Sequence, residues 1–233
     1  MTQKQLNTIP TVLSLGGSLV VPDGIDVRFV KKFRAFILPQ VRAGKRFVII
    51  VGGGKTARRY QHAGSAIVRM KKEDLDWIGI HASRLNAQLL LSSIEHYAHP
   101  RLITSIQDAP KKLNKPVLIA AGFVPGASTD LRAVQLGKLY KAKTILNLSN
   151  IDWVYSDDPR THPKAKKIKA MTWPAFRKKF GTRWDPGANV PFDPVASKAA
   201  QRNKMAVIIT RGDDFLNLEN ILSSRKHKGT TLA

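Results

Sequence analysis

The chain has 233 residues, 43% of them hydrophobic, so it can bury a full core as one large α/β domain or as two small lobes. It has no cysteine, which excludes disulfides and thiolate metal sites, and no apolar run long enough to span a membrane. The apolar stretch near the amino terminus is interrupted by Gly16, Gly17 and Ser18 and lacks a cleavage-site pattern. We therefore expect a soluble, cytoplasmic protein.

The charge is strongly positive, with 39 Lys and Arg against 16 Asp and Glu, a net charge of +23. Such a surface suits anionic partners, either nucleotides or nucleic acid. Along the sequence the cations are spread as pairs such as Lys31-Lys32, Lys71-Lys72 and Lys178-Lys179, with no aromatic RNA-binding strand and no arginine-rich tail. The pattern favours a solvated basic surface, and nucleic-acid binding is the alternative.

Strand-like apolar runs alternate with helical patterns, which is typical of βαβ units and a mostly parallel sheet. The predicted strands are residues 11–15, 46–51, 116–121, 143–149 and 205–210. The predicted helices are residues 25–44, closed by Gly44, residues 74–98, and residues 128–142, with Ser128 or Thr129 as N-cap. We expect a single domain, 1–233, built as a three-layer α/β/α sandwich.

The stretch "IIVGGGKTARRY" raises the question of which phosphate the chain holds. Gly54, Lys55 and Thr56 read as the end of a Walker A loop, but that loop's first glycine falls at Ile49, inside an apolar strand. A dinucleotide fingerprint also fits the glycines, yet its confirming acidic residue falls in "KKEDLDWIGI", which reads as helix. Neither motif is supported.

Glycine-rich or polar segments follow four of the predicted strands: "GGS" (16–18), "GGGK" (52–55), "GFVPGASTD" (122–130) and "NIDWVYSDDP" (150–159). In open α/β sheets, ligands bind at the carboxyl ends of the strands, where backbone amides and helix N-termini meet anions. Each segment alone is a weak signal. Their convergence on one edge predicts a site for phosphate-bearing ligands, with enough loops for two.

Taken together, these segments resemble the amino-acid kinase superfamily, and within it the uridylate kinases of the archaeal-like branch. The resemblance covers nearly the whole chain and includes "LSLGGSLVVP", "VGGGKTARRY", "DWIGIHASRLNA", "VPGASTD", "NLSNIDWVYSDDPR", "FDPVASKAA" and "NLENILSS…KGTTL", in the family's order. It implies transfer of the γ-phosphoryl group of ATP to UMP, with Mg²⁺ and without a Walker loop. It also implies a homohexamer built as a trimer of dimers, for which residues 26–43 are a plausible dimer face.

The resemblance assigns the substrate-binding residues. Gly53, Asp76 and the run Phe123, Val124, Pro125, Gly126, Ala127, Ser128 and Thr129 face UMP, with Asp76 on the ribose hydroxyls. Gly17, Ser18, Gly54, Arg58, Ser149, Asn150, Tyr155 and Asp158 face ATP. It places UMP mainly on the N-terminal part of the chain and ATP mainly on the part from about residue 143. No residue is assigned as a protein metal ligand.

For the chemistry itself, Asp130 is the candidate that orients cationic groups or metal near the γ-phosphate. Relatives often carry a lysine two residues before the first glycine pair, where this chain has Ser14. Lys55, Arg58 and Lys198 are the candidates for the missing cation. A second departure is Trp153, where relatives usually carry glycine, and it alters the expected pocket for the ATP base.

Three readings stay open on the sequence alone. The favoured one is an ATP-dependent UMP kinase, since "PGASTD" together with "DWIGI" suits a ribose-bearing acceptor. A kinase of the same fold acting on acetylglutamate or isopentenyl phosphate is the runner-up. A non-catalytic nucleotide-binding or nucleic-acid-binding relative is the alternative from a different class.

Overall fold

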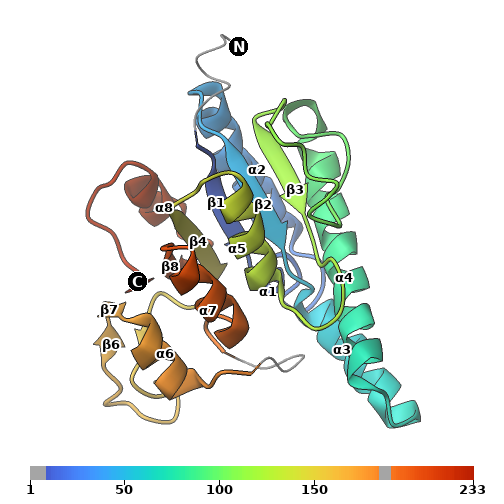
Figure 1. Cartoon of the computed structure of the whole chain (residues 1–233), viewed down its shortest axis with the longest axis vertical. Coiled ribbons are helices and arrows are strands. Elements are labelled where there is room, and N and C mark those ends of the chain that lie inside the picture. The colour runs from blue at the N-terminus through green and yellow to red at the C-terminus, as the bar shows by residue number, and fades with distance from the viewer. Residues whose placement is uncertain (1–8, 184–189) are drawn as a thin grey trace.

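The computed structural model describes residues 9–183 and 190–233 (Figure 1). Its centre is a seven-stranded sheet in the order β3-β2-β1-β4-β8-β9-β7, and β5 pairs with β6 in a separate two-stranded sheet. The strands are β1 (Thr11–Leu15), β2 (Phe47–Val51), β3 (Val117–Ala120), β4 (Thr144–Ser149), β5 (Val154–Tyr155), β6 (Lys167–Ile168), β7 (Ala170–Met171), β8 (Ala206–Arg211) and β9 (Thr230–Leu232). In the large sheet β8 and β9 form the one antiparallel pair. Since β7 runs parallel to β9, these two strands run opposite to the other five.

Helices cover both faces of this sheet, so the predicted three-layer sandwich is confirmed. The helices are α1 (Gly17–Val20), α2 (Val27–Arg42), α3 (Gly54–Ile67), α4 (Lys72–Ser93), α5 (Thr129–Leu139), α6 (Trp173–Phe180), α7 (Pro194–Arg202) and α8 (Phe215–Leu222). One core holds side chains of α2, α4 and α8, and the other holds side chains of α5, α6 and α7. Figure 1 shows α5 and α7 in front of the sheet and α2 behind it.

The central strands form because both of their faces are buried. In β2 all five residues are buried; Phe47, Ile49 and Val51 enter one core, while Val48 and Ile50 enter the other. Continuous apolar runs of this kind are the pattern of parallel strands between two helix layers. The five strands predicted from these runs are all present, each within one residue of the predicted bounds. The burial of Ile49 also removes the Walker A reading.

Helix α2 lies where its periodicity predicted. Asp26 caps it by accepting a hydrogen bond from the Phe29 amide at 2.8 Å, and Gly44 follows its end with φ +87°. Its apolar residues, Phe33 among them, pack into the chain's own core. The outward side of α2 is therefore basic rather than apolar, with Arg28, Lys31 and Lys32 exposed.

The two other predicted helices are present, but each ends before the predicted residue, and α5 ends at Leu139 instead of residue 142. Helix α5 begins after Ser128, whose side chain accepts from the Leu131 amide at 3.2 Å, as an N-cap does. Helix α4 ends at Ser93 instead of continuing to residue 98, because Ile94 leaves the helical region with φ −133° and a 3₁₀ turn, Glu95–Tyr97, follows. A dinucleotide site needs an acidic residue at the end of a second strand. Here the acids at that distance, Glu73 and Asp74, lie in the first turn of α4, so the dinucleotide fingerprint also fails.

Sequence patterns gave no bounds for helices α1, α3, α6, α7 and α8 or for the short strands β5, β6, β7 and β9. Strands of two or three residues are too short for a periodic pattern. Helices α6, α7 and α8 do carry start signals, since Thr172, Asp193 and Asp214 accept capping hydrogen bonds at their N-termini. Part of the predicted irregular segment around "WDPGANVPFDP" falls in residues 184–189 and lies outside the described residues.

The parallel order brings the exits of β3, β2, β1 and β4 to one edge of the sheet, as expected. The segments after them are those that hold the predicted ligand residues. Within residues 9–183 and 190–233, no helix combines the length and apolar character needed to cross a bilayer.

Candidate active site

The loops after β1 and β2 touch each other through their backbones. A Cβ atom built on Gly17 would lie 2.2 Å from the Gly54 nitrogen and 2.3 Å from the Gly52 oxygen, so only glycine fits there. The Asn86 side chain of α4 fixes the second loop by donating from Nδ2 to the carbonyl oxygens of Gly52, at 2.9 Å, and Gly53, at 3.1 Å. The two glycine loops therefore form one rigid floor beneath the ligand edge.

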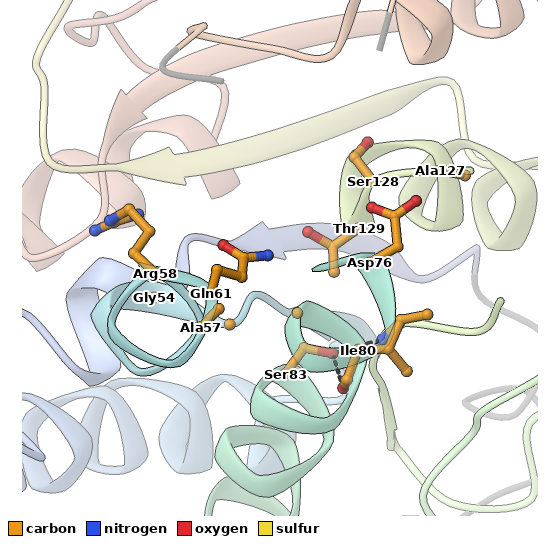
Figure 2. A pocket seen from close by; sticks show the side chains of 13 residues that line it. Gly54, Ala57, Arg58, Gln61, Asp76, Ile80, Ser83, Ala127, Ser128 and Thr129 are labelled. Carbon is orange, nitrogen blue, oxygen red and sulfur yellow. Dashed lines mark hydrogen bonds between the residues drawn. The ribbon is translucent and has the colours of Figure 1, made fainter. Parts of the chain in front are cut away.

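A first cavity of about 200 Å³ opens between α3, α4 and the N-terminus of α5. Its lining is Gly53, Gly54, Ala57, Arg58, Gln61, Asp76, Gly79, Ile80, Ser83, Gly122, Ala127, Ser128 and Thr129. Figure 2 shows Arg58 and Gln61 rising from α3 on one side, with Asp76, Ser128 and Thr129 on the other. We call it the α3–α4 cavity.

Asp76 is 9% exposed and holds the segment between β3 and α5. Its Oδ2 accepts a hydrogen bond from the Gly126 amide at 2.7 Å, which leaves Oδ1 available to a ligand hydroxyl. Farther along α4, Arg84 donates to the carbonyl oxygens of Gly122, at 3.1 Å, and Phe123, at 2.9 Å. Side chains of α4 therefore position the whole loop over the cavity.

Only part of the predicted run 123–129 reaches this cavity. Ala127, Ser128 and Thr129 line it, whereas Phe123 is buried, with the Arg132 guanidinium 5.1 Å from its ring centre. Val124 is 55% exposed and faces outward, and neither Pro125 nor Gly126 lines the cavity. The loop thus contributes its last three residues as lining and its first four as a scaffold.

A middle cavity of about 470 Å³ lies above the exits of β1 and β4. Its lining is Ser14, Gly16, Gly17, Ser18, Leu19, Gly52, Arg58, Ser128, Thr129, Asp130, Asn147, Leu148, Ser149, Asn150, Val190, Pro191 and Asp193. The predicted phosphate contacts Gly17 and Ser18 lie here. Gly54, which the resemblance assigns to ATP, lines the α3–α4 cavity instead.

Asp130 is the central acid of the middle cavity. Its Oδ1 accepts hydrogen bonds from Ser14 Oγ at 2.8 Å and Asn147 Nδ2 at 2.9 Å, and its Oδ2 accepts from the Asp193 amide at 3.1 Å. Burial of the carboxyl group raises its pKa to about 6, with the nearby Asp193 charge adding to the rise and the hydrogen bonds opposing it. Ser14 therefore binds the acid directly.

Asp193 joins the start of α5, which lines both the α3–α4 cavity and the middle cavity, to the start of α7. Its Oδ2 accepts a short hydrogen bond, 2.5 Å, from Ser128 Oγ, and its Oδ1 caps α7 by accepting from the Val195 amide at 2.7 Å. Because the Ser128 hydroxyl donates its hydrogen to Asp193, the groups that remain for an anion at the start of α5 are the Thr129 hydroxyl and the free backbone amides.

A third space, of about 610 Å³, follows the exit of β4, and we call it the C-terminal groove. It is lined by Ser149, Asn150, Ile151, Asp152, Trp153, Val154, Tyr155, Ser156, Asp157, Asp158, Pro159, Arg160, Lys179, Phe180, Val190, Pro191 and Arg211. The four predicted residues Ser149, Asn150, Tyr155 and Asp158 all lie in it, as does Trp153. The Arg160 guanidinium donates to both carboxylate oxygens of Asp158, at 3.0 Å from Nε and 2.7 Å from Nη2, and its backbone amide donates at 3.0 Å; these hydrogen bonds lower the pKa of that carboxyl to about 2.

The three spaces form one continuous path along the sheet edge. The α3–α4 cavity and the middle cavity share Arg58, Ser128 and Thr129. The middle cavity and the C-terminal groove share Ser149, Asn150, Val190 and Pro191. Two anionic ligands entering from opposite ends would meet in the middle, beside Asp130 and Arg58.

The three candidate cations differ in position. Arg58 lines both inner cavities and donates to Ser18 Oγ at 3.1 Å. Lys55 points away and forms an exposed ion pair with Asp23 at 3.4 Å. Lys198 is exposed on α7 and lines none of the three spaces.

Several lining residues escaped sequence reasoning. Gln61, Gly79 and Ser83 reach the α3–α4 cavity from helix surfaces, where nothing in the sequence distinguishes them from ordinary helix positions. Asn147 and Asp193 did carry signals: Asn147 is a polar residue inside the apolar run "TILNLS", and Asp193 precedes a proline at a helix start.

A mostly parallel sheet covered on both faces, with two cavities that meet beside a buried acid and an arginine, suits a phosphotransferase that aligns a donor and an acceptor. The sequence comparison names the family. The profile described as "Amino acid kinase family" matches residues 10–211, and this chain belongs to that family.

Uridylate kinases are among its curated relatives. That of Pyrococcus abyssi is 32% identical over 223 residues, covering 95% of this chain and 98% of the relative. That of Methanospirillum hungatei is 34% identical over 230 residues, covering 95% and 94%. The family match over residues 10–211 includes every residue that lines the three spaces.

Solved structures give the same picture. The uridylate kinase of Archaeoglobus fulgidus matches with a TM-score of 0.80 and 30% identity, covering 96% of this chain and 100% of that one. The UMP kinase of Bacillus anthracis matches with a TM-score of 0.76 over 96% of this chain and 95% of its own, at 18% identity, and supports the fold.

Replacing Gly17 with alanine should disrupt the site. The added methyl group meets backbone atoms that cannot rotate away, so we expect a loss of about 1–3 kcal/mol in the free energy of unfolding and a large loss of phosphoryl transfer. Gly24→Ala is the matched control, because its Cβ has nothing within 4 Å. Chemical denaturation and turnover measurements on both variants check this, and a fully active, stable Gly17→Ala protein would contradict it.

Asp130 should make the ligand-free protein less stable as the pH rises. Its folded-state pKa of about 6 lies above the ordinary 3.8, so the folded state holds this proton more tightly and loses that advantage as the pH rises through 6. Between about pH 5 and about pH 8, the wild type should lose about 1 kcal/mol relative to Asp130→Asn, which does not titrate.

Denaturant titrations of both proteins at several pH values measure this difference. The hydrogen bond from the Asp193 amide is lost in the asparagine variant at every pH, so it adds only a constant offset. A stability difference that does not change with pH would show that Asp130 keeps an ordinary pKa.

Proposed function

We propose that this chain is an ATP-dependent UMP kinase, which transfers the γ-phosphoryl group of ATP to UMP and gives UDP and ADP. The observation that carries the proposal is the continuous path of three spaces, with Asp76 at one end and Asp130 in the middle. The names of the relatives support the same reaction.

In this proposal UMP occupies the α3–α4 cavity. The free Oδ1 of Asp76 accepts hydrogen bonds from the ribose hydroxyls, and the phosphate points toward the N-terminus of α5. Thr129 and the unpaired amides of that helix end meet the phosphate, where the helix dipole favours negative charge. A carboxylate acceptor without ribose hydroxyls would leave Oδ1 of Asp76 without a ligand donor, which argues against acetylglutamate.

ATP then occupies the C-terminal groove, with its phosphates in the middle cavity. Ser149, Asn150 and Tyr155 line the part proposed for the base and ribose, and Gly17 and Ser18 lie beneath the phosphates. This arrangement supports a division in which the N-terminal part binds UMP and the part from about residue 143 binds ATP. Both lie within one domain spanning 1–233.

The chain's own residues do little more than align the two nucleotides and balance charge. Arg58 lies where the two phosphate chains would meet and is the cation we assign to the transferred group. Asp130, held by Ser14 and Asn147, orients the positive groups around it. Lys55 stays a candidate only if it leaves its pair with Asp23.

Mg²⁺ fits this site as a partner of the nucleotide phosphates. It prefers oxygen ligands and usually takes only one or two carboxylates from a protein, the rest coming from phosphates and water. Asp130 and Asp193 supply such carboxylates, and the described residues contain no cluster of three or more His, Cys, Asp or Glu that would form a complete protein cage. When bound, Mg²⁺ would neutralise charge on the phosphates.

A homohexamer built as a trimer of dimers belongs to the same proposal and rests on the family resemblance. In the single chain α2 buries its apolar side, so a dimer through residues 26–43 would use the basic outer side or its ends. Light scattering at working concentration measures the assembly.

An acceptor panel tests the function. ATP consumption is followed with UMP, CMP, acetylglutamate, isopentenyl phosphate or no acceptor, first with Mg²⁺ and then with EDTA. The proposal requires turnover with UMP that EDTA abolishes. Preference for either non-nucleotide acceptor would favour a different kinase of this fold, and no turnover with any acceptor would favour a non-catalytic relative.

The Asp76→Asn variant should bind UMP more weakly without slowing the chemistry. The asparagine oxygen can still accept from the Gly126 amide, but the NH₂ group then faces the ribose in place of an acceptor. Losing a hydrogen bond to a charged group costs about 1.5–3 kcal/mol, so KM for UMP should rise about tenfold or more while kcat and KM for ATP hold. Steady-state kinetics with each nucleotide varied give these constants.

Two comparisons sharpen this test. Asp74→Asn removes an exposed charge two residues earlier on α4, more than half a turn round the helix from Asp76, and should leave all constants unchanged. Asp130→Asn should lower kcat with little change in either KM, because its contacts act on the transferred group. If Asp76→Asn lowered kcat with both KM values unchanged, the ribose assignment would be wrong.

A further inference from the structure

One half of the molecular surface carries many more cations than acids, and its exposed acids, Asp157 and Asp158, lie in the segment between β5 and β6 that lines the C-terminal groove. Within the described residues of 131–151, 159–183 and 190–212, Asp193 is the only acid, and it is 1% exposed inside the site. On the opposite helix layer acids are interspersed with cations, as Glu73 and Asp74 show on α4. The net charge of +23 is therefore distributed unevenly in space.

The fold brings these cations together, although they are dispersed along the sequence. Helix α7 packs against both α5 and α6, and the three helices follow one another across the front of the sheet in Figure 1. Each buries apolar residues and exposes a cation: Lys138 on α5, Arg202 on α7 and Lys178 on α6. These side chains belong to three separate segments, so a single charged run does not explain them.

The segment around β6 extends the same surface. Lys164, Lys166, Lys167 and Lys169 are all exposed. It lies beside α6, because Ser156 accepts a hydrogen bond from Lys179 through its carbonyl oxygen and donates its amide to the Lys166 carbonyl at 2.9 Å. We call the outer surface of α5, α7, α6 and β6 the basic face.

The basic face is larger than a single nucleotide needs. Lys141 and Lys204 precede β4 and β8, at the edge of the sheet opposite the active site, and both are exposed. Helix α7, nine residues long, spans about 13 Å between the two edges. Steering of ATP toward its groove would require cations only at the near edge, whereas this surface continues to the far one.

The side chains of the basic face suit binding to the phosphate groups of a nucleic acid and do not suit recognition of its bases. Most of its cations are lysines, which act as point charges for phosphate. The large exposed hydrophobic residues of the described chain lie on other segments, so this face offers neither rings for stacking single-stranded bases nor side chains for insertion into a bilayer. A duplex presents one charge about every 1.7 Å along its axis, which a broad lysine surface can follow.

We propose that the basic face of α5, α7, α6 and β6 binds the phosphate backbone of a nucleic-acid duplex without regard to sequence, separately from the kinase site. RNA and DNA duplexes share this chemistry, and binding to either one is the proposed activity.

Two triple variants test the proposal at equal net charge. Lys138→Gln, Lys178→Gln and Arg202→Gln remove one cation from each helix of the face. Arg28→Gln, Lys31→Gln and Lys32→Gln remove the same residue types from the outer side of α2 on the opposite layer, and light scattering checks that both variants keep the wild-type assembly. Fluorescence anisotropy with labelled RNA duplex, DNA duplex and single strands of each is measured over a series of salt concentrations, and phosphoryl transfer to UMP serves as the folding control.

Wild-type protein should bind duplex with a steep salt dependence, and the basic-face variant should bind at least tenfold more weakly, with a slope of log K against log salt smaller by about 2–3. The α2 variant should retain wild-type affinity within about twofold. Both variants should keep their turnover. Absence of duplex binding, equal losses in both variants, tighter binding to single strands, or binding only to anionic lipid vesicles would overturn the proposal.

Discussion

The loops after β1 and β2 touch backbone to backbone, and no side chain fits between them at Gly17. This contact requires the two strands to be parallel neighbours in register, which their burial between two helix layers provides. It sets the starting points of α1 and α3, and through Asn86 it is joined to α4. Since α3 carries Arg58 and α4 carries Asp76, the geometry of the inner cavities depends on it.

The middle of the site is held by polar groups that oppose stability. Asp130 is buried beside Asp193 without an ion pair among the described residues, and its raised pKa reflects that cost. Its hydrogen bonds from Ser14, Asn147 and the Asp193 amide fix its orientation before any ligand enters. Positively charged ligand groups that relieve the repulsion would bind here with an advantage that a solvated surface acid lacks.

Much of this arrangement follows from sequence patterns whose physics is local. The five central strands are continuous apolar runs, and α2 has a capping aspartate, a 3.6-residue periodicity and a terminal glycine, so both could be predicted. The convergence of the glycine segments follows from parallel topology. The resemblance to the family supplied roles, but it did not show that Phe123 turns inward or that Lys55 pairs with Asp23.

The remaining features depend on contacts between distant segments. The role of Ser14 as a hydrogen-bond donor to Asp130 spans 116 residues, and that of Ser128 toward Asp193 spans 65. Neither hydrophobic periodicity nor a helix-cap pattern in the sequence predicts hydrogen bonds between residues so far apart. The same holds for the surface: the lysines of α5, α6 and β6 lie apart in sequence, and only the packing of α7 between two helices places them on one face.

Arg58 lines both inner cavities, which has a consequence for how the two ligands bind. One guanidinium that contacts anions on either side makes the affinity for each depend on whether the other is present. Linkage requires that dependence to be equal in both directions, whatever the order of addition. If the first anion draws Arg58 away from Ser18 into the position that the second one needs, occupancy of either cavity strengthens binding in the other, and the protein favours the ternary complex over either binary one.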